Sequence, residues 1–215
     1  MNIEIAIVGL GKMGLGINNR LSKKGIKVYG YDSGWNKDLY KKNSINGANS
    51  LKDLIGLFNS SRKIIWVMVP SGKATDETIT NLNTLLDEGD VIIDGGNSNY
   101  KESIKKYNLL KSNKISFLDS GTSGGVWGEK DGYCLMVGGD KDAYEICEPI
   151  FKALSAKDKG YGYMGKSGSG HFVKMIHNGI EYGMMQSMAE GIEILNQKKE
   201  YNLDLTQITE LWKSG

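Results

Sequence analysis

Cysteine, proline and arginine are scarce in this sequence, and the scarcity of cysteine already excludes some classes of protein. The chain of 215 residues has two cysteines and two prolines. Cys134 and Cys147 have neither metal-ligand spacing nor the dense framework of a disulfide-stapled secreted domain. We therefore expect two reduced core thiols in a cytoplasmic protein without a metal site.

Long apolar runs and blocks of like charge are also lacking. No apolar run approaches the roughly 18 residues that a membrane span needs. The first residues, 2–9, read as a strand and not as a secretory signal. The net charge is +2 and lysine is spread along the chain, so no basic patch indicates nucleic acid. With 40% apolar and 24% charged residues, the composition is that of a soluble globular protein. We expect neither nucleic acid nor a membrane as a partner.

The two arginines, Arg20 and Arg62, lie far in sequence from the stretch 165–186 near the end of the chain. Arginine is the preferred bidentate partner of phosphate and carboxylate groups. An anionic substrate would therefore need lysines, backbone amides, or arginines supplied from outside this chain.

A glycine-rich turn is present near the beginning of the chain, between a predicted strand and a predicted helix. Gly9, Gly11 and Gly14 follow an apolar run, and Asp32 ends the next predicted strand 18 positions after Gly14. This arrangement is typical of a dinucleotide-binding turn, with a tight turn at Gly9, close approach of the pyrophosphate at Gly11 and helix packing at Gly14. The alternative is a glycine turn without a ligand.

Strand and helix patterns alternate along the first 165 residues. This order predicts an α/β fold, a Rossmann-like, doubly wound and mostly parallel sheet covered by helices on both faces. Ligands of such sheets gather at the carboxyl ends of the strands, where we expect the turns after Val8, Val69, Asp94 and Asp119. The predicted strands are 3–8, 27–32, 63–69, 90–94, 116–119, 133–137 and 161–164, and the predicted helices are 13–24, 51–59, 75–86, 100–112 and 141–154.

A long helix is predicted from about Ser169, where the alternation stops. Five chemically different polar side chains fall on one stripe of this helix at about 100° per residue, and four apolar ones fall on the other side. One interpretation is a solvated face, and the other is a reaction pocket with a base, an acid and hydrogen-bonding groups on one rigid element. The polar residues are Lys174, His177, Asn178, Glu181 and Tyr182, and the apolar residues are Phe172, Ile176, Ile180 and Met184.

Together these residues resemble the 6-phosphogluconate dehydrogenase family, within the larger group of β-hydroxyacid dehydrogenases. The similarity covers essentially all 215 residues. The end of the strand and helix alternation near Gly165 places a domain boundary there, with a dinucleotide-binding domain over residues 1–165. The resemblance implies that residues 166–215 begin an all-helical substrate and oligomerisation domain. The segments that carry it are Gly9-Leu10-Gly11-Lys12-Met13-Gly14, Asp94-Gly95-Gly96-Asn97-Ser98, Ser123-Gly124-Gly125 and Gly168 to Tyr182.

The activity that the resemblance implies is oxidative decarboxylation of 6-phosphogluconate to ribulose 5-phosphate. Lys174 would be the general base at the C3 hydroxyl and Glu181 the acid that protonates C1. Free lysine has a pKa of about 10.4, but burial lowers the pKa of a lysine and raises that of a glutamate. The implied substrate-binding residues are Asn97, Ser123, Gly124, Gly125, His177, Asn178 and Tyr182, and the implied cofactor-binding residues are Gly9, Gly11, Lys12, Met13, Gly14, Asp32, Val69, Pro70 and Asn97.

Two other functions stay open at this point. Another β-hydroxyacid dehydrogenase, of the 3-hydroxyisobutyrate type, shares the glycine turn and the spacing of Lys174 and Asn178. A dinucleotide-binding module without catalysis is the alternative from another class.

The cofactor expected from Asp32 is NAD in preference to NADP, because a carboxylate there binds the ribose hydroxyls and repels a 2′-phosphate. The resemblance also implies a homodimer or homotetramer for the full-length protein, which continues through the helical domain. We accordingly expect these 215 residues to bind the dinucleotide without turning over substrate.

Overall fold

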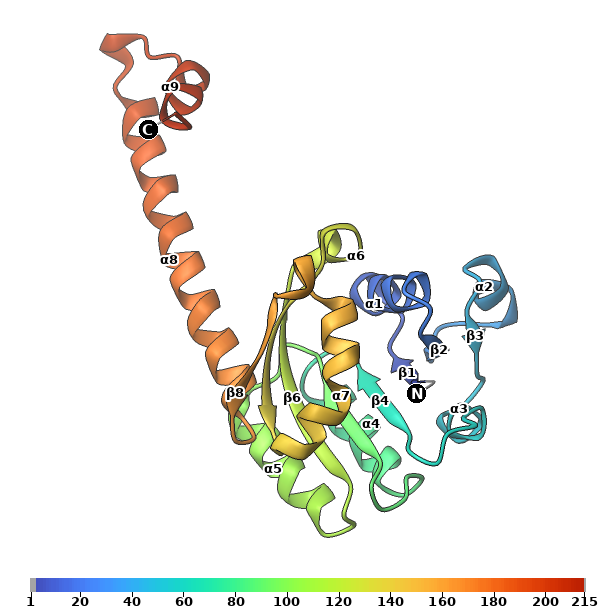
Figure 1. Ribbon diagram of the computed structural model, residues 1–215. Coiled ribbons are helices and arrows are strands. Elements are labelled where there is room, and N and C mark those ends of the chain that lie inside the picture. Colours follow the sequence, from blue (N-terminus) through green and yellow to red (C-terminus); the bar gives the residue numbers. More distant parts are fainter. Residues whose placement is uncertain (1–2, 215) are drawn as a thin grey trace. The chain divides into compact units, whose positions relative to one another are not determined.

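The computed structural model describes residues 3–214, which form two compact units, one ending at Lys174 and one beginning at Met175. Within the first unit, the described strands form one eight-stranded sheet in the order β3-β2-β1-β4-β5-β6-β7-β8 (Figure 1). All neighbouring pairs are parallel except β6 and β7. The strands are β1 (Glu4–Val8), β2 (Lys27–Tyr31), β3 (Asn46–Gly47), β4 (Ile64–Val67), β5 (Val91–Asp94), β6 (Ser116–Ser123), β7 (Cys134–Gly139) and β8 (Tyr161–Gly165).

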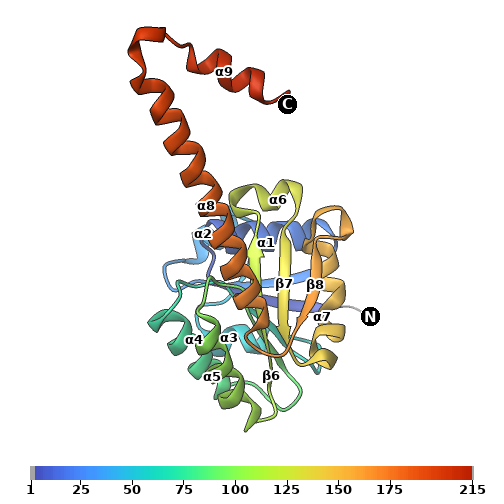
Figure 2. The same ribbon diagram turned by 90° about the vertical axis from the view of Figure 1, so that its left-hand side faces the viewer.

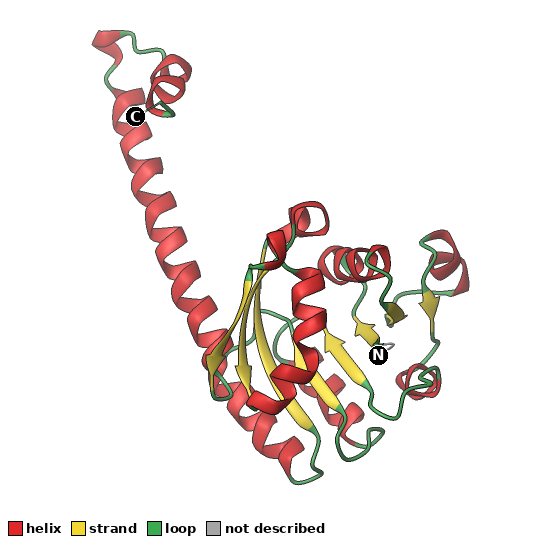
Figure 3. Cartoon of the chain, viewed as in Figure 1, coloured by secondary structure: helices red, strands yellow, loops and turns green. Residues whose placement is uncertain are grey.

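Helices cover both faces of this sheet (Figure 3). One buried apolar cluster packs α1 and α7 against one face, and the other packs α3, α4 and α5 against the opposite face. The predicted Rossmann-like, mostly parallel fold is therefore confirmed. The helices are α1 (Lys12–Lys23), α2 (Lys37–Lys42), α3 (Leu51–Gly56), α4 (Lys73–Asn83), α5 (Tyr100–Lys111), α6 (Gly128–Asp131), α7 (Lys141–Leu154), α8 (Ser169–Gln197) and α9 (Leu205–Trp212), with 3₁₀ turns at Gly125–Trp127, Ala156–Asp158 and Lys199–Tyr201.

The prediction of a strand that ends at Asp119 was wrong, because β6 continues to Ser123. From Leu118 onward it pairs antiparallel with β7, with Leu118 opposite Gly139 and Ser123 opposite Cys134. A strand that gains a second partner can continue through small polar residues, because the partner's backbone satisfies its N–H and C=O groups.

The prediction that both cysteines lie in the core was also wrong for one of them. Cys147 is buried in α7, and its burial raises the pKa of the thiol to about 12. Cys134 is exposed at the start of β7. Both are free thiols.

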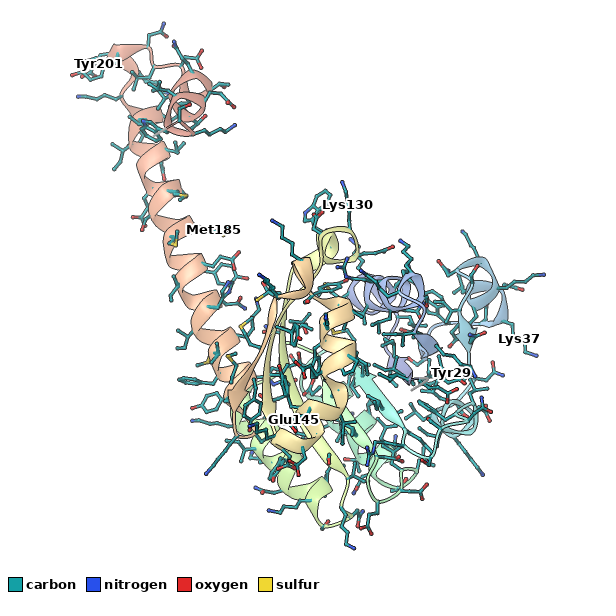
Figure 4. All side chains as sticks on the ribbon, in the orientation of Figure 1. Tyr29, Lys37, Lys130, Glu145, Met185 and Tyr201 are labelled. Atoms are coloured by element: carbon teal, nitrogen blue, oxygen red, sulfur yellow. The ribbon has the colours of Figure 1, made fainter. Side chains whose placement is uncertain are left out.

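The second unit contains the rest of α8 from Met175 and the short helix α9. Its apolar side chains are largely exposed: Met185 is 56% and Tyr201 is 65% accessible (Figure 4). The predicted boundary at residue 165 stays a prediction. Within the described residues, no helix is both long enough and apolar enough to cross a membrane.

Candidate active site

A cleft of about 870 Å³ opens where β1 and β4 end, at the point where the strand order reverses. In an open α/β sheet this is the expected position of a ligand. The structure brings together all nine residues predicted to bind a cofactor, and each of them lines this cleft. They are Gly9, Gly11, Lys12, Met13, Gly14, Asp32, Val69, Pro70 and Asn97.

The three glycines of the turn differ in what requires them. Gly9 has φ of 95°, and a Cβ there would lie 2.5 Å from the carbonyl oxygen of Met68. A Cβ on Gly14 would overlap the carbonyl oxygen of Gly9. A Cβ on Gly11 would meet nothing within 4 Å. The fold therefore explains Gly9 and Gly14, whereas the space over Gly11 is left open on the cleft side.

The N-terminus of α1 faces this cleft without a side-chain cap. Gly11 is its N-cap residue, and no acidic side chain lies in its first turn. Free N–H groups and the positive end of the helix dipole attract anions. Lys12, the first residue of the helix, is the one cationic side chain among the lining residues described. This set of donors fits the pyrophosphate of a dinucleotide.

Asp32 lies just after β2 with its carboxylate fixed by two backbone amides. Leu10 N–H donates to Oδ2 at 2.7 Å, and Gly34 N–H donates to Oδ1 at 2.8 Å. A carboxylate has about four lone-pair sites, so Asp32 retains acceptor capacity for the hydroxyls of a ribose. The first bond also ties the acidic residue directly to the glycine turn.

Helix α4 supplies a side of the cleft that sequence reasoning missed. Four of its residues recur at the i, i+3, i+4, i+7 spacing of one helix face. That spacing, directly after the turn at Pro70, was the available signal. The four residues are Ala74, Glu77, Thr78 and Asn81.

The ends of β5 and β6 place the predicted substrate residues of the first unit. Asn97 is exposed in the turn after β5 and lines the cleft together with Thr122, which was not predicted. Ser123 is the last residue of β6, and Gly124 and Gly125 follow with φ of 127° and 52°. These last three residues do not line the cleft itself.

Lys174 ends the first unit and is only 9% exposed. It lies in α8, with its Cβ directly against Gly121 of β6, two residues before Ser123. The role of Lys174 as a general base stays a prediction.

The other residues predicted from the stripe on α8 belong to the second unit. His177 and Glu181 are one helical turn apart, with Nδ1 and Oε2 separated by 3.7 Å, and both are about half exposed. Tyr182 is 67% exposed and Asn178 is partly buried. Their roles in substrate binding and catalysis stay predictions.

Both arginines are occupied elsewhere in the fold. Arg20 donates to the carbonyl oxygens of Glu129, Lys130, Ala153 and Ser155, and Arg62 Nε donates to that of Gly89. Neither lines the cleft. The described residues also contain no group of three or more His, Cys, Asp or Glu side chains that could hold a metal ion.

This combination of fold and cleft defines an oxidoreductase domain that binds a nicotinamide dinucleotide. Residues 4–165 match the NAD binding domain of 6-phosphogluconate dehydrogenase, and residues 170–215 match the C-terminal domain of 6-phosphogluconate dehydrogenase. The chain therefore belongs to the 6-phosphogluconate dehydrogenase family, as the sequence motifs predicted.

Known relatives agree with this assignment. The protein YqeC of Bacillus subtilis is 45% identical over 214 residues, which are 99% of this chain and 71% of that protein. An NAD+-dependent, decarboxylating 6-phosphogluconate dehydrogenase of Haloferax volcanii is 38% identical over 214 residues, 99% of this chain and 70% of that protein. Longer relatives, such as the decarboxylating enzyme of Bacillus licheniformis, are covered over 48% of their length.

Solved structures show the same fold. The 6-phosphogluconate dehydrogenase of Plasmodium falciparum superposes with a TM-score of 0.88 at 31% identity, over 99% of this chain and 48% of that one. The 3-hydroxyisobutyrate dehydrogenase of Mycobacterium tuberculosis superposes with a TM-score of 0.84 at 20% identity, over 100% of this chain and 71% of that one. The second likeness concerns the fold alone.

Proposed function

We propose that this protein catalyses the NAD+-dependent oxidative decarboxylation of 6-phosphogluconate to ribulose 5-phosphate and CO2. The observation that carries the proposal is the burial of Lys174 against β6, beside the strand end that carries Ser123. A relative that is 38% identical is named as an NAD+-dependent, decarboxylating 6-phosphogluconate dehydrogenase.

The residues of the cleft have separable tasks in this proposal. The uncapped N-terminus of α1 and Lys12 hold the pyrophosphate, and the open space over Gly11 admits it. Asp32 accepts hydrogen bonds from the adenosine ribose. A nicotinamide held in this cleft would supply the acceptor for the hydride that leaves C3 of the substrate. Asn97 and Thr122, which line the cleft, orient the groups near that carbon.

Lys174 and Glu181 move the protons. Lys174 Nζ takes the proton of the C3 hydroxyl as the C3 carbon is oxidised to a ketone. The same ammonium then donates a hydrogen bond to the 3-keto oxygen, which accepts negative charge as the C1 carboxylate leaves as CO2. Glu181 protonates the enediol at C2 of the former substrate, the carbon that becomes C1 of ribulose 5-phosphate. Each step is general acid–base catalysis by a positioned side chain.

The carboxylate of Asp32 favours NAD over NADP in this proposal. A 2′-phosphate beside a fixed carboxylate is repelled. Lys37, the first cationic residue after β2, does not line the cleft. Lys37 lies on α2 with an exposed side chain (Figure 4).

The test is a substrate panel with two readouts, NADH absorbance and captured CO2, on the protein as it is made in the cell. Equal amounts of NADH and CO2 from 6-phosphogluconate are expected. NADH without CO2 from 3-hydroxyisobutyrate would instead indicate the other dehydrogenase type. Dinucleotide binding without turnover of either substrate would leave a binding module and end the proposal.

A further inference from the structure

The first turn of α8 is held by a carboxylate from a distant part of the chain. Asp119, fully buried in β6, accepts hydrogen bonds from Gly168 N–H at 2.6 Å and from His171 N–H at 2.9 Å. These are two of the N–H groups that a helix start leaves without an intrahelical partner. Asp119 therefore caps α8 across 49 and 52 residues of sequence.

Burial and these backbone amides shift the pKa of Asp119 in opposite directions. Desolvation raises the pKa of Asp119 above its usual value, while His171 and the two backbone amides oppose the rise. The neighbouring Asp94, directly opposite in the register of β5 and β6, adds to it. A buried carboxylate costs free energy unless hydrogen bonds compensate for the lost water, and each oxygen of Asp119 accepts one from the first turn of α8.

The first turn of α8 crosses in front of the sheet in Figure 2, and its backbone approaches β6 and β7 closely at three glycines. A Cβ on Gly170 would overlap the carbonyl oxygens of Asp119 and Met136, and a Cβ on Gly138 would lie 2.6 Å from Ser169 Oγ. A Cβ on Gly121 would overlap the Cβ of Lys174. Glycines on both sides thus let the helix backbone rest on β6 and β7, with the stem of Lys174 pressed against Gly121.

A third contact fixes the turn from the side. His171 is 2% exposed, and its Nδ1 lies 2.7 Å from the Oγ of Ser103, which is fully buried in α5. The turn that precedes Lys174 by three residues is therefore attached to β6 through Asp119 and to α5 through Ser103.

We infer that Asp119 is a positioning residue for Lys174, which sets the height and rotation of α8 over β6 so that the amine is held at the end of that strand. Ser103 supports this task through His171. The inference rests on the proposed function for the role of Lys174, but the geometry that it describes can be tested without turnover. Misplacement of a reacting group by about 1 Å can reduce a rate by about 10²-fold.

Asp119→Asn is the main variant. In the wild type each carboxylate oxygen accepts from one backbone N–H group, whereas in the variant an NH₂ group replaces one of these oxygens and faces an N–H donor. Asp90→Asn is the matched control. Asp90 is equally buried, and its carboxylate accepts from the backbone N–H groups of Lys63 and Asp87 at 2.8 and 3.0 Å. Asp90 also pairs with Lys63 Nζ at 3.3 Å. Both changes remove a buried carboxylate with two backbone amide donors, but only Asp119 holds α8.

Two measurements do not need activity: hydrogen exchange over residues 168–174, and the rate at which acetic anhydride labels Lys174 relative to the exposed Lys141. Asp119→Asn is expected to raise both by about tenfold through local opening of the turn, and Asp90→Asn is expected to leave both unchanged. Unchanged values in Asp119→Asn, or equal changes in the two variants, would overturn the inference. If Asp119→Asn does not fold, Ser103→Ala decides, with a smaller rise in the same segment expected and no rise counting against it.

The third measurement is NADH formation with 6-phosphogluconate by the protein as it is made in the cell. Asp119→Asn should lower kcat by about 10²-fold and leave the Kd of NAD+ unchanged, because Asp119 does not line the cleft. Wild-type-like kcat in this variant would contradict the inference. If the unsubstituted protein does not oxidise 6-phosphogluconate, the proposed function fails, and the exchange and labelling results still decide whether Asp119 positions Lys174.

Discussion

The backbone N–H of Leu10 donates a hydrogen bond of 2.7 Å to Oδ2 of Asp32. Leu10 lies inside the glycine turn and Asp32 follows the next strand, so one bond fixes the acidic residue relative to the turn that would hold the pyrophosphate. Because Oδ1 is held by Gly34 N–H as well, the negative charge stays at the edge of the cleft and cannot turn away from a ligand.

Asp32→Asn should therefore weaken discrimination between the two dinucleotides. The amide oxygen can still accept one backbone hydrogen bond, but the charge that repels a 2′-phosphate is gone. We expect the ratio of kcat/KM for NAD to that for NADP to fall by about tenfold, in the range of one lost charge interaction. The control is Asp38→Asn, an exposed acid on α2 that does not line the cleft. An unchanged ratio in Asp32→Asn, or a higher kcat/KM for NADP in the unsubstituted enzyme, would show that Asp32 does not set the preference.

Gly11→Ala and Gly14→Ala should separate ligand binding from folding. The new methyl group at position 11 meets nothing within 4 Å, and its φ of −65° suits alanine. This variant should keep its Tm and lose about tenfold or more in affinity for NAD+, since the methyl occupies the space left for the pyrophosphate.

At position 14 the new methyl overlaps the carbonyl oxygen of Gly9, so this variant should lose stability by about 1–3 kcal/mol through overpacking. Thermal unfolding measures the stability of both variants, and calorimetric titration measures their affinity for NAD+. Undiminished NAD+ affinity in Gly11→Ala would show that the pyrophosphate does not occupy the open space over Gly11.

Local patterns in the sequence predicted the sheet and the cleft well. The run before Gly9, the turn itself and Asp32 are close in sequence, and their spacing predicts both the strand–turn–helix unit and its ligand edge. Val69, Pro70 and Asn97 could be added because parallel strands end at the same edge of a sheet.

Features that depend on tertiary contacts were not predictable. The residues from Ser120 to Ser123 have no strand pattern of their own and are extended because β7 pairs with them, which fits the strong context dependence of strand formation. Asp119 contacts α8 across about 50 residues of sequence, and no local pattern connects them. Glu77 and Asn81 were missed for a different reason, since their helical spacing was visible but the direction of that face was not.

Glu4 should make stability depend on pH. Burial alone would raise the pKa of Glu4, but hydrogen bonds from Lys27 and from the backbone N–H groups of Ser60 and Asn59 lower it to about 2, from a usual value of 4.5. A carboxylate with a depressed pKa in the folded state contributes stability above its unfolded pKa, and the contribution is lost as pH falls from about 4.5 toward about 2.

Glu4→Gln should accordingly lower the free energy of unfolding at pH 7 by about 2–3 kcal/mol, and the difference from the unsubstituted protein should shrink steadily below about pH 4.5. Urea unfolding between pH 7 and about pH 3 measures this. Glu88→Gln is the control, because Glu88 pairs with Lys114 at an exposed site where such pairs contribute little. A difference that does not vary with pH would mean that Glu4 acts through packing alone.

Lys174→Met and Glu181→Gln should slow different steps. Methionine keeps the apolar stem that packs on Gly121 but has no amine, so turnover of 6-phosphogluconate should fall by at least about 10²–10⁴-fold, the range of general acid–base catalysis. The Kd of NAD+ should stay unchanged, because Lys174 does not line the cleft. Glu181→Gln should reduce turnover less, because removal of the hydroxyl proton is intact and only protonation of the enediol is impaired.

The control for Lys174→Met is Lys106→Met. Lys106 is another buried lysine of the first unit, 7% exposed and paired with Asp76 at 2.7 Å, and its replacement should leave kcat within about twofold, as for a residue away from the reacting atoms. Stopped-flow measurement of NADH formation, beside steady-state turnover and NAD+ titration, separates hydride transfer from later steps. Wild-type-like hydride transfer in Lys174→Met would exclude this lysine as the base. A parallel loss of NAD+ binding in Lys174→Met would instead show that its fold is disturbed. The kinetic comparison would then rest on Lys174→Arg. Arginine keeps a positive charge at this position but cannot lose a proton at neutral pH.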